Sequence, residues 1–130
     1  MEINWLAVIA AALSSFVLGG IWYAALFGKA HQKAAGLSDE QVKSANMPLI
    51  FGGSFVLALI AAASFAVFLG PEVDAMTGAM YGFTAGLCWV SASFGINYLF
   101  ERKSLALFCI NGGYHTLQFT LIGLILGAWH

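Results

Sequence analysis

The distribution of charged residues is the feature that most restricts how this chain can fold. Its five Lys or Arg and six Asp or Glu residues lie in a few short segments. Between these segments are four uncharged stretches: Ile3–Gly28, Ser44–Pro71, Ala75–Phe100 and Ser104–His130. As a helix, each would reach roughly 39 Å at about 1.5 Å per residue. The hydrocarbon core of a membrane requires about 20 residues, so each stretch is long enough to cross it.

The composition excludes a soluble alternative. Charged residues make up 8 % of the 130 residues and hydrophobic residues 61 %, whereas a soluble domain carries about a quarter charged residues. So few charges cannot cover a water-facing surface, which excludes a cytosolic enzyme. The formal net charge of −1 also excludes the basic surface that nucleic-acid binding requires.

The expected fold class follows from the lipid environment. Within lipid the backbone must satisfy its own hydrogen bonds, and the alternating pattern of a barrel strand is absent, so only helices remain. We predict an all-α polytopic integral membrane protein, a four-transmembrane-helix bundle forming a single domain over 1–130. The spans are expected at about 3–28, 47–70, 75–100 and 104–129. The first span should be retained, because its start carries Glu2 without Lys or Arg and its apolar run exceeds the roughly 7–15 residues of a signal core.

Local signals mark the ends of these spans. Residues 38–41, Ser-Asp-Glu-Gln, have the form of a capping box and predict a short helix in the loop 29–46. Pro48 suits the first turn of the second span. Gly70 followed by Pro71 predicts the end of that span.

The orientation is predicted from the cations. All five lie in the first and third loops, as Lys29, Lys33, Lys43, Arg102 and Lys103. Positively charged loops stay in the cytoplasm, so loops 29–46 and 101–103 are expected there, with both termini outside a bacterial inner (plasma) membrane. Trp5 and Trp129 would mark the outer interface, and Trp22, Tyr23 and Tyr98 the inner one, where amphipathic rings prefer to sit.

Small residues recur at a spacing of four on every span, which predicts close helix packing. The stripes are Ala7, Ala11, Ser15 and Gly19; Ser54, Ala58, Ala62, Ala66 and Gly70; Gly78, Gly82 and Gly86; and Gly123 and Gly127. Such stripes also arise by chance in spans rich in alanine and glycine. Four helices need not use every stripe internally, so we expect a homo-oligomer.

A short internal repeat is visible. Residues 20–23, Gly-Ile-Trp-Tyr, are similar to 95–98, Gly-Ile-Asn-Tyr, and Gly52-Gly53 to Gly112-Gly113. This pattern favours two helical hairpins related by an axis along the membrane normal.

Several motifs together resemble the domain of unknown function 1761 family of small membrane proteins. They are Asn4-Trp5-Leu6-Ala7-Val8, Trp22-Tyr23, Leu26-Phe27-Gly28-Lys29, residues 97–102 (Asn-Tyr-Leu-Phe-Glu-Arg) and residues 110–114 (Ile-Asn-Gly-Gly-Tyr). The resemblance covers nearly the whole chain and implies the same four-span architecture. Family members often carry a kink-forming proline where this chain has Ala24-Ala25. The resemblance implies no activity, substrate or cofactor.

Polar residues near the middle of the third and fourth spans form the candidate site. Asn111, His115 and Gln118 fall on one helix face. Counting about 1.5 Å per residue from the 101–103 turn places His115 level with Trp89 and Asn111 level with Ser93. The candidates for a ligand contact or polar path are therefore Asn111, His115, Gln118, Trp89, Ser93 and Asn97. Alternatively, the polar groups only form interhelical hydrogen bonds, and Trp89 fills the bundle or faces lipid.

Other chemistry is not indicated. No Asp, Glu, Lys or Arg lies deep in a span, although proton-coupled transporters usually need such a carboxylate. Motifs for catalysis, metal binding or nucleotide binding are absent, so we expect neither an enzyme nor a cofactor. Cys88 and Cys109 would lie about 10 Å apart in depth, too far for a disulfide, and are expected to be buried thiols. His31 and His130 receive no role.

Two functions remain open. The first is a structural or interaction protein whose polar residues only fix packing, with membrane lipid and a second copy of itself as partners. The second is a small transporter or channel subunit with a polar path at Asn111, His115 and Gln118 and a small ligand of unknown identity.

Overall fold

The computed structural model describes residues 3–129, and every regular element within that range is helical. The elements are α1 (Trp5–Gly20), the π-helix η1 (Ile21–Leu26), α2 (Gly28–Ala35), α3 (Asp39–Lys43), α4 (Met47–Leu69), α5 (Ala75–Thr84), the π-helix η2 (Ala85–Ser91), α6 (Ala92–Glu101) and α7 (Leu105–Ala128). The expected all-α class is thus confirmed for the described residues.

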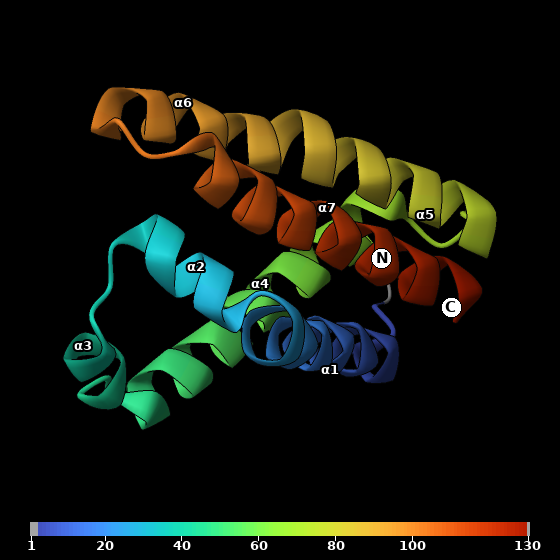
Figure 1. Cartoon of the computed structure of the whole chain (residues 1–130). Helices are drawn as coiled ribbons and strands as arrows, with labels where there is room; N and C mark the ends of the chain where they lie inside the picture. Colours follow the sequence, from blue (N-terminus) through green and yellow to red (C-terminus); the bar gives the residue numbers. More distant parts are fainter. Residues whose placement is uncertain (1–2, 130) are drawn as a thin grey trace.

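The helices form a bundle around α7. Helices α5, η2 and α6 make one continuous rod, and α7 returns along it, as Figure 1 shows. Helix α7 also packs against α1 and α4. The core where these helices meet contains Ala7, Val8, Ala11, Ala62, Phe65, Leu69, Ala85, Ile122 and Leu126.

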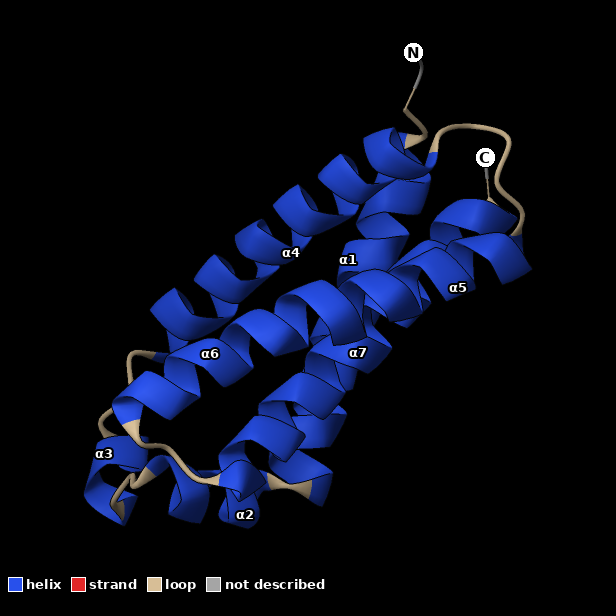
Figure 2. Ribbon diagram, turned by 90° about the horizontal axis from the view of Figure 1, so that it is seen from above, coloured by secondary structure: helices blue, strands red, loops and turns tan. Residues whose placement is uncertain are grey.

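The two ends of the bundle differ in charge. Figure 2 shows α2, α3 and the α6–α7 turn at one end, and the start of α1, the end of α7 and the α4–α5 turn at the other. At the second end the Nδ2 of Asn4 donates a hydrogen bond to the carbonyl oxygen of Trp129 at 3.4 Å. All five cations belong to α2, α3 and the α6–α7 turn, so they share the first end.

Three helical segments are long and apolar enough to cross a membrane: Trp5–Leu26, Met47–Leu69 and Ala75–Glu101. They correspond to the first three expected spans. Helix α7 has 24 residues and no formal charge, but it is not among these three because its central third is polar. The expected count of four spans therefore stays a prediction.

The local signals act where the sequence places them. Ser38 and Gln41 form the capping box that opens α3, and Pro48 lies in the first turn of α4. Gly70 ends α4 with φ +77°, a conformation that costs little only for glycine. Asp74 caps α5 by accepting a hydrogen bond from the Thr77 amide at 2.8 Å.

The α5–η2 rod and α7 meet through their backbones. A Cβ added to Gly78 would meet the carbonyl of Gly123, one on Gly82 the carbonyl of Phe119, and one on Gly86 the carbonyl oxygen of His115 at 2.7 Å. On the α5 side, Gly127 also adjoins Asp74. On the other side of α7 the buried small residues are Ala7, Ala11 and Ser15 of α1 and Ala58 and Ala62 of α4, while Ala66 is half-buried and Gly19 adjoins Tyr114. The small-residue stripes therefore make close contacts within one chain, except at Ser54, which is exposed, and at Gly70, where an added Cβ would meet nothing within 4 Å.

The first span ends without a proline. It continues α1 as the π-helix η1 and breaks at Phe27 (φ −122°, ψ 17°) before α2 begins. Gly28 permits this turn, because a Cβ there would lie 2.7 Å from the carbonyl oxygen of Tyr23. The bend is made by a π-helix and a glycine.

Candidate functional site

The candidate site lies on the polar face of α7. This helix starts at the Ser104 N-cap, whose side chain accepts the amide of Leu107. One uninterrupted helix then carries Asn111, His115 and Gln118 on the side that faces the other helices. Gln118 is only 7 % exposed, while Asn111 and His115 are half-buried.

Asn111 is held between two tyrosines. The hydroxyl of Tyr23 donates to its Oδ1 at 2.6 Å, and its Nδ2 donates to the Tyr98 hydroxyl at 2.6 Å. Tyr23 belongs to η1 and Tyr98 to α6, so one amide joins three helices. We call Tyr23, Asn111 and Tyr98 the Asn111 clamp.

Neither tyrosine is among the predicted site residues, because the sequence places both only in the inner aromatic belt. The internal repeat is the signal that could have identified them. It matches Tyr23 with Tyr98, and the structure brings these two residues to the same amide.

His115 and Gln118 form a second polar pair. The Nδ1 of His115 and the Oε1 of Gln118 are 2.7 Å apart. The imidazole stacks on Phe94 of α6, with ring centroids 4.9 Å apart and an interplanar angle of 10°. The Tyr114 ring meets the imidazole edge-on at 4.9 Å.

Three more side-chain hydrogen bonds join α7 to its neighbours. The Tyr114 hydroxyl donates to the carbonyl oxygen of Ser15 at 3.0 Å, and the Trp22 Nε1 to that of Ile110 at 2.8 Å. Ser91 donates to the carbonyl oxygen of Gly112 at 2.8 Å. These bonds tie α1, η1 and η2 to α7.

The structure does not bring Trp89, Ser93 and Asn97 to the polar face of α7. Trp89 is 57 % exposed, and its ring lies edge-on to Phe68. Ser93 is exposed and donates to the carbonyl of Trp89 in its own helix. Asn97 is also exposed. The expectation that these three residues share the candidate site with Asn111, His115 and Gln118 is therefore not met.

The π-helix η2 explains this difference. An α-helix would place the next inner residue three or four positions after Gly86, at Trp89 or Val90, but the i→i+5 bonding of a π-helix moves it to the fifth position. That residue is Ser91, which is 2 % exposed. The next residue that faces α7 is Gly95, because a Cβ there would lie 2.9 Å from the Phe108 ring.

Titratable groups near the site are few. His31 of α2 lies beside Tyr23, with ring centroids 4.9 Å apart, and burial lowers the pKa of His31 below its usual value. Within residues 3–129 no group of three His, Cys, Asp or Glu could hold a metal ion. Cys88 and Cys109 are free, as expected, but both are exposed rather than buried.

The buried polar atoms of the site are satisfied internally. Among the described residues, no buried side-chain nitrogen or oxygen lacks a hydrogen-bond partner. A binding site for a polar ligand usually keeps donors or acceptors available for it, whereas Asn111 bonds tyrosines of two other helices and His115 bonds Gln118 within α7. The arrangement is suited to holding helices together.

Comparison with known proteins identifies a family. The family described as "Protein of unknown function (DUF1761)" matches residues 6–127. No curated protein and no solved structure matches this chain.

Proposed function

The chain belongs to the DUF1761 family, and we propose that it is an integral membrane protein whose polar residues lock a helical bundle that serves as a structural or interaction module. The observation that carries this proposal is the Asn111 clamp, in which both ends of one amide bond tyrosines of two other helices. The proposal assigns no catalytic residue and no cofactor. The proposed location is a bacterial inner membrane, with the cation-bearing end of the bundle in the cytoplasm.

The proposal treats α7 as the fourth span. A membrane helix may carry polar side chains where neighbouring helices cover them. Helix α7 packs against α1, α4, α5 and η2, and its Gln118 is buried among them. Of the residues that make α7 less apolar than the other spans, Asn111 and Tyr114 hydrogen-bond neighbouring helices. His115 and Gln118 bond each other within α7.

The His115–Gln118 pair provides the test. In His115→Leu the buried Gln118 oxygen loses its partner, which we expect to lower the free energy of unfolding by about 1–3 kcal/mol. The double variant His115→Leu/Gln118→Leu removes both partners and should recover most of this loss, since replacing a whole hydrogen-bonded pair can be nearly neutral. Thermal unfolding in detergent measures both variants.

A small transporter or channel subunit is the second candidate, with a path at Asn111, His115 and Gln118. It is favoured by the half-buried His115 ring, whose Nε2 has no hydrogen-bond partner among the described residues. In that case His115→Leu would keep the stability of the protein and change a flux across reconstituted vesicles. Stability retained together with altered flux would replace the first proposal by this one.

The proposal includes a homo-oligomer. Since the buried stripe residues are used within the chain and Ser54 is exposed, the contact would lie on the first half of α4. Nothing lies within 4 Å of a Cβ placed on Gly52 or Gly53, so helices could approach closely there. Gly53→Leu should shift the sedimentation of the detergent-solubilised protein toward the monomer without lowering its melting temperature. An unchanged sedimentation coefficient would exclude this contact.

A further inference from the structure

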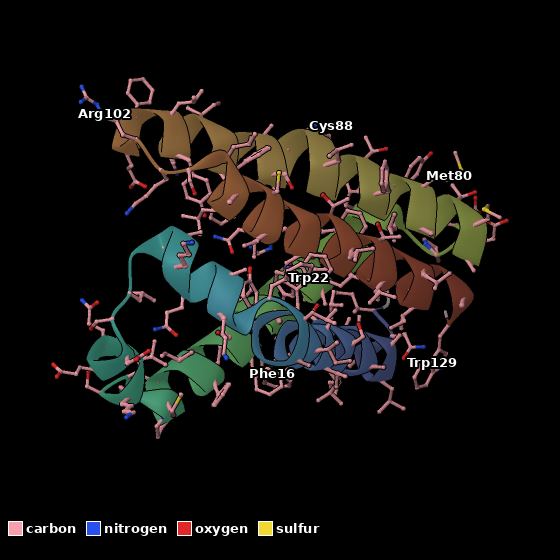
Figure 3. The ribbon with its side chains drawn as sticks, in the orientation of Figure 1. Phe16, Trp22, Met80, Cys88, Arg102 and Trp129 are labelled. Carbon is pink, nitrogen blue, oxygen red and sulfur yellow. The ribbon has the colours of Figure 1, made fainter. Side chains whose placement is uncertain are left out.

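An open groove runs along the flank of α7 that faces away from α4. It has a volume of about 320 Å³ and is bounded by Trp22 of η1, Leu87 and Ser91 of η2, and Phe108, Cys109 and Gly113 of α7. Figure 3 shows Trp22 between the end of α1 and α7. The floor is flat, because Gly112 and Gly113 carry no side chain there.

The groove offers nothing to a polar ligand. Its two hydroxyl groups are already bonded: Ser91 and Thr116 both donate to the carbonyl oxygen of Gly112 at 2.8 Å. The indole N–H of Trp22 is bonded to the carbonyl oxygen of Ile110. The remaining lining consists of aromatic rings, aliphatic side chains, glycines and the Cys109 thiol. An occupant of the groove must therefore be apolar along its whole length.

The length of the groove matches one lipid leaflet. Its lining on α7 runs from Phe108 to Leu117, about 14 Å at about 1.5 Å per residue. That is close to half of the roughly 30 Å hydrocarbon core. Because α7 begins at Leu105, directly after the cationic α6–α7 turn, the groove extends from the cation-bearing end to the middle of the membrane.

The charge at that end indicates the head group. Arg102 and Lys103 precede the groove on α7, and Lys29 follows Trp22 at the start of α2. This end carries all five cations against Asp39, Glu40 and Glu101, a net charge of +2 (five minus three), whereas the opposite α4–α5 turn carries Glu72 and Asp74. Cations at a membrane surface attract anionic lipids.

We propose that this groove holds one acyl chain of an anionic phospholipid from the leaflet at the cation-bearing end, with the phosphate near the α6–α7 turn. The inference rests on the proposed membrane location. It adds a lipid-binding site to the bundle and specifies both where the acyl chain lies and the charge of the head group.

Trp22 itself can report the occupant. A variant that keeps only Trp22 (Trp5→Phe, Trp89→Phe and Trp129→Phe) is reconstituted into phosphatidylcholine vesicles with increasing phosphatidylglycerol brominated at mid-chain. A variant that keeps only the exposed Trp89 reports bulk lipid. Half-maximal quenching of Trp22 should occur at a mole fraction at least about fivefold lower than for Trp89. Coincident curves would overturn the proposal. So would a Trp22 that stays unquenched while Trp89 is quenched, because a second protein chain would then cover the groove.

The two free cysteines supply a matched pair for the groove. Cys109 lines it, whereas Cys88 does not and lies at the outer edge of the α5–η2–α6 rod (Figure 3). In the Trp22-only protein, Cys109→Phe should fill the groove and move the quenching curve to that of Trp89, and Cys88→Phe should leave it unchanged. Cys109→Leu replaces the larger variant if circular dichroism shows loss of helix. A Trp22 curve that neither Cys109 variant moves overturns the groove assignment.

The head group is tested separately. Arg102→Gln/Lys103→Gln should raise the mole fraction for half-maximal quenching of Trp22 while maximal quenching is kept. If this variant still prefers phosphatidylglycerol over phosphatidylcholine to the same degree, the proposed recognition of an anionic head group is wrong. If no brominated lipid quenches either tryptophan, the proposed membrane location is wrong. Strong and coincident quenching of both tryptophans would instead keep the membrane location and overturn only the groove assignment.

Discussion

At the scale of single residues, the Asn111 clamp explains how a helix in an apolar bundle tolerates an amide. A buried polar group is costly unless it is hydrogen-bonded, and Asn111 has a tyrosine on each side at 2.6 Å. Tyrosine suits this role, because its ring packs in an apolar bundle while its hydroxyl reaches a polar partner. The amide therefore fixes the relative positions of η1, α6 and α7.

Removing one side of the clamp should weaken the bundle measurably. Tyr98→Phe deletes the acceptor of the Asn111 amide and keeps the ring, so the free energy of unfolding should fall by about 0.6–1 kcal/mol. Tyr81→Phe is the matched control, because Tyr81 is exposed on α5 and its variant should stay within about 0.5 kcal/mol. Chemical unfolding in detergent compares the two. Equal effects would show that the clamp does not contribute to stability.

His31 should make the stability depend on pH. Burial lowers the pKa of His31 in the folded protein below its ordinary value of 6.5. As the pH falls below that value, the unfolded chain binds more protons than the folded one, so the free energy of unfolding decreases. The decrease stops below the folded pKa. Melting temperatures between about pH 7.5 and 5 should therefore fall less for His31→Gln than for the unmodified protein, and parallel profiles would contradict this assignment.

The residue pattern predicted part of the candidate site. The placement of Asn111, His115 and Gln118 on one face follows from helical spacing alone. Their partners Tyr23, Tyr98 and Phe94 depend on how neighbouring helices rotate. That rotation is set by packing across the bundle, and the spacing within one helix does not contain it.

At the scale of elements, η2 determines which face of the third span is inside. The inner residues are Gly78, Gly82, Gly86, Ser91 and Gly95, and the spacing of four widens once, across η2. Sequence spacing predicted the glycine part of this stripe, but Trp89 and Ser93, which were expected in the candidate site, lie outside it. A π-helix has no simple sequence signature, so the one-residue shift could not be read from the chain.

The glycine contacts predict opposite outcomes for the same substitution in two helices. Gly82→Ala places a Cβ against the Phe119 carbonyl of α7, and forced separation of the helices should cost about 1–3 kcal/mol. Gly52→Ala on α4 meets nothing within 4 Å and should be neutral or stabilise by up to about 1 kcal/mol. Thermal unfolding in detergent distinguishes them. A neutral Gly82→Ala would mean that α5 and α7 pack less closely than described.

At the scale of the whole molecule, the charge-free stretches predicted the helices well. The expected spans at about 3–28, 47–70, 75–100 and 104–129 agree within two residues with Trp5–Leu26, Met47–Leu69, Ala75–Glu101 and Leu105–Ala128. Charges are excluded from lipid, so they mark helix ends directly. Helix α7 packs between the α5–η2–α6 rod and α1. This arrangement depends on contacts between residues far apart in the sequence, so it was not predictable from the ends of the charge-free stretches.

The shared location of the cations predicts which amines are accessible. A membrane-impermeant lysine reagent added to intact cells should leave Lys33 and Lys43 unlabelled, because positively charged ends stay in the cytoplasm. In Glu72→Lys the new amine lies on the opposite α4–α5 turn and should be labelled in the same cells. Site-resolved mass spectrometry reads both. Labelling of Lys33 or Lys43 without cell lysis would reverse the proposed orientation.

The hydrogen bond between Asn4 and Trp129 has a consequence for the order of the helices. Because the start of α1 and the end of α7 touch, a short linker could join them, and the chain could be opened instead in the exposed segment between Gly36 and Ser38. Such a circular permutant would begin with α3 and finish with α2. It would keep all the interhelical contacts, so the architecture depends on which helices meet and not on which is synthesised first.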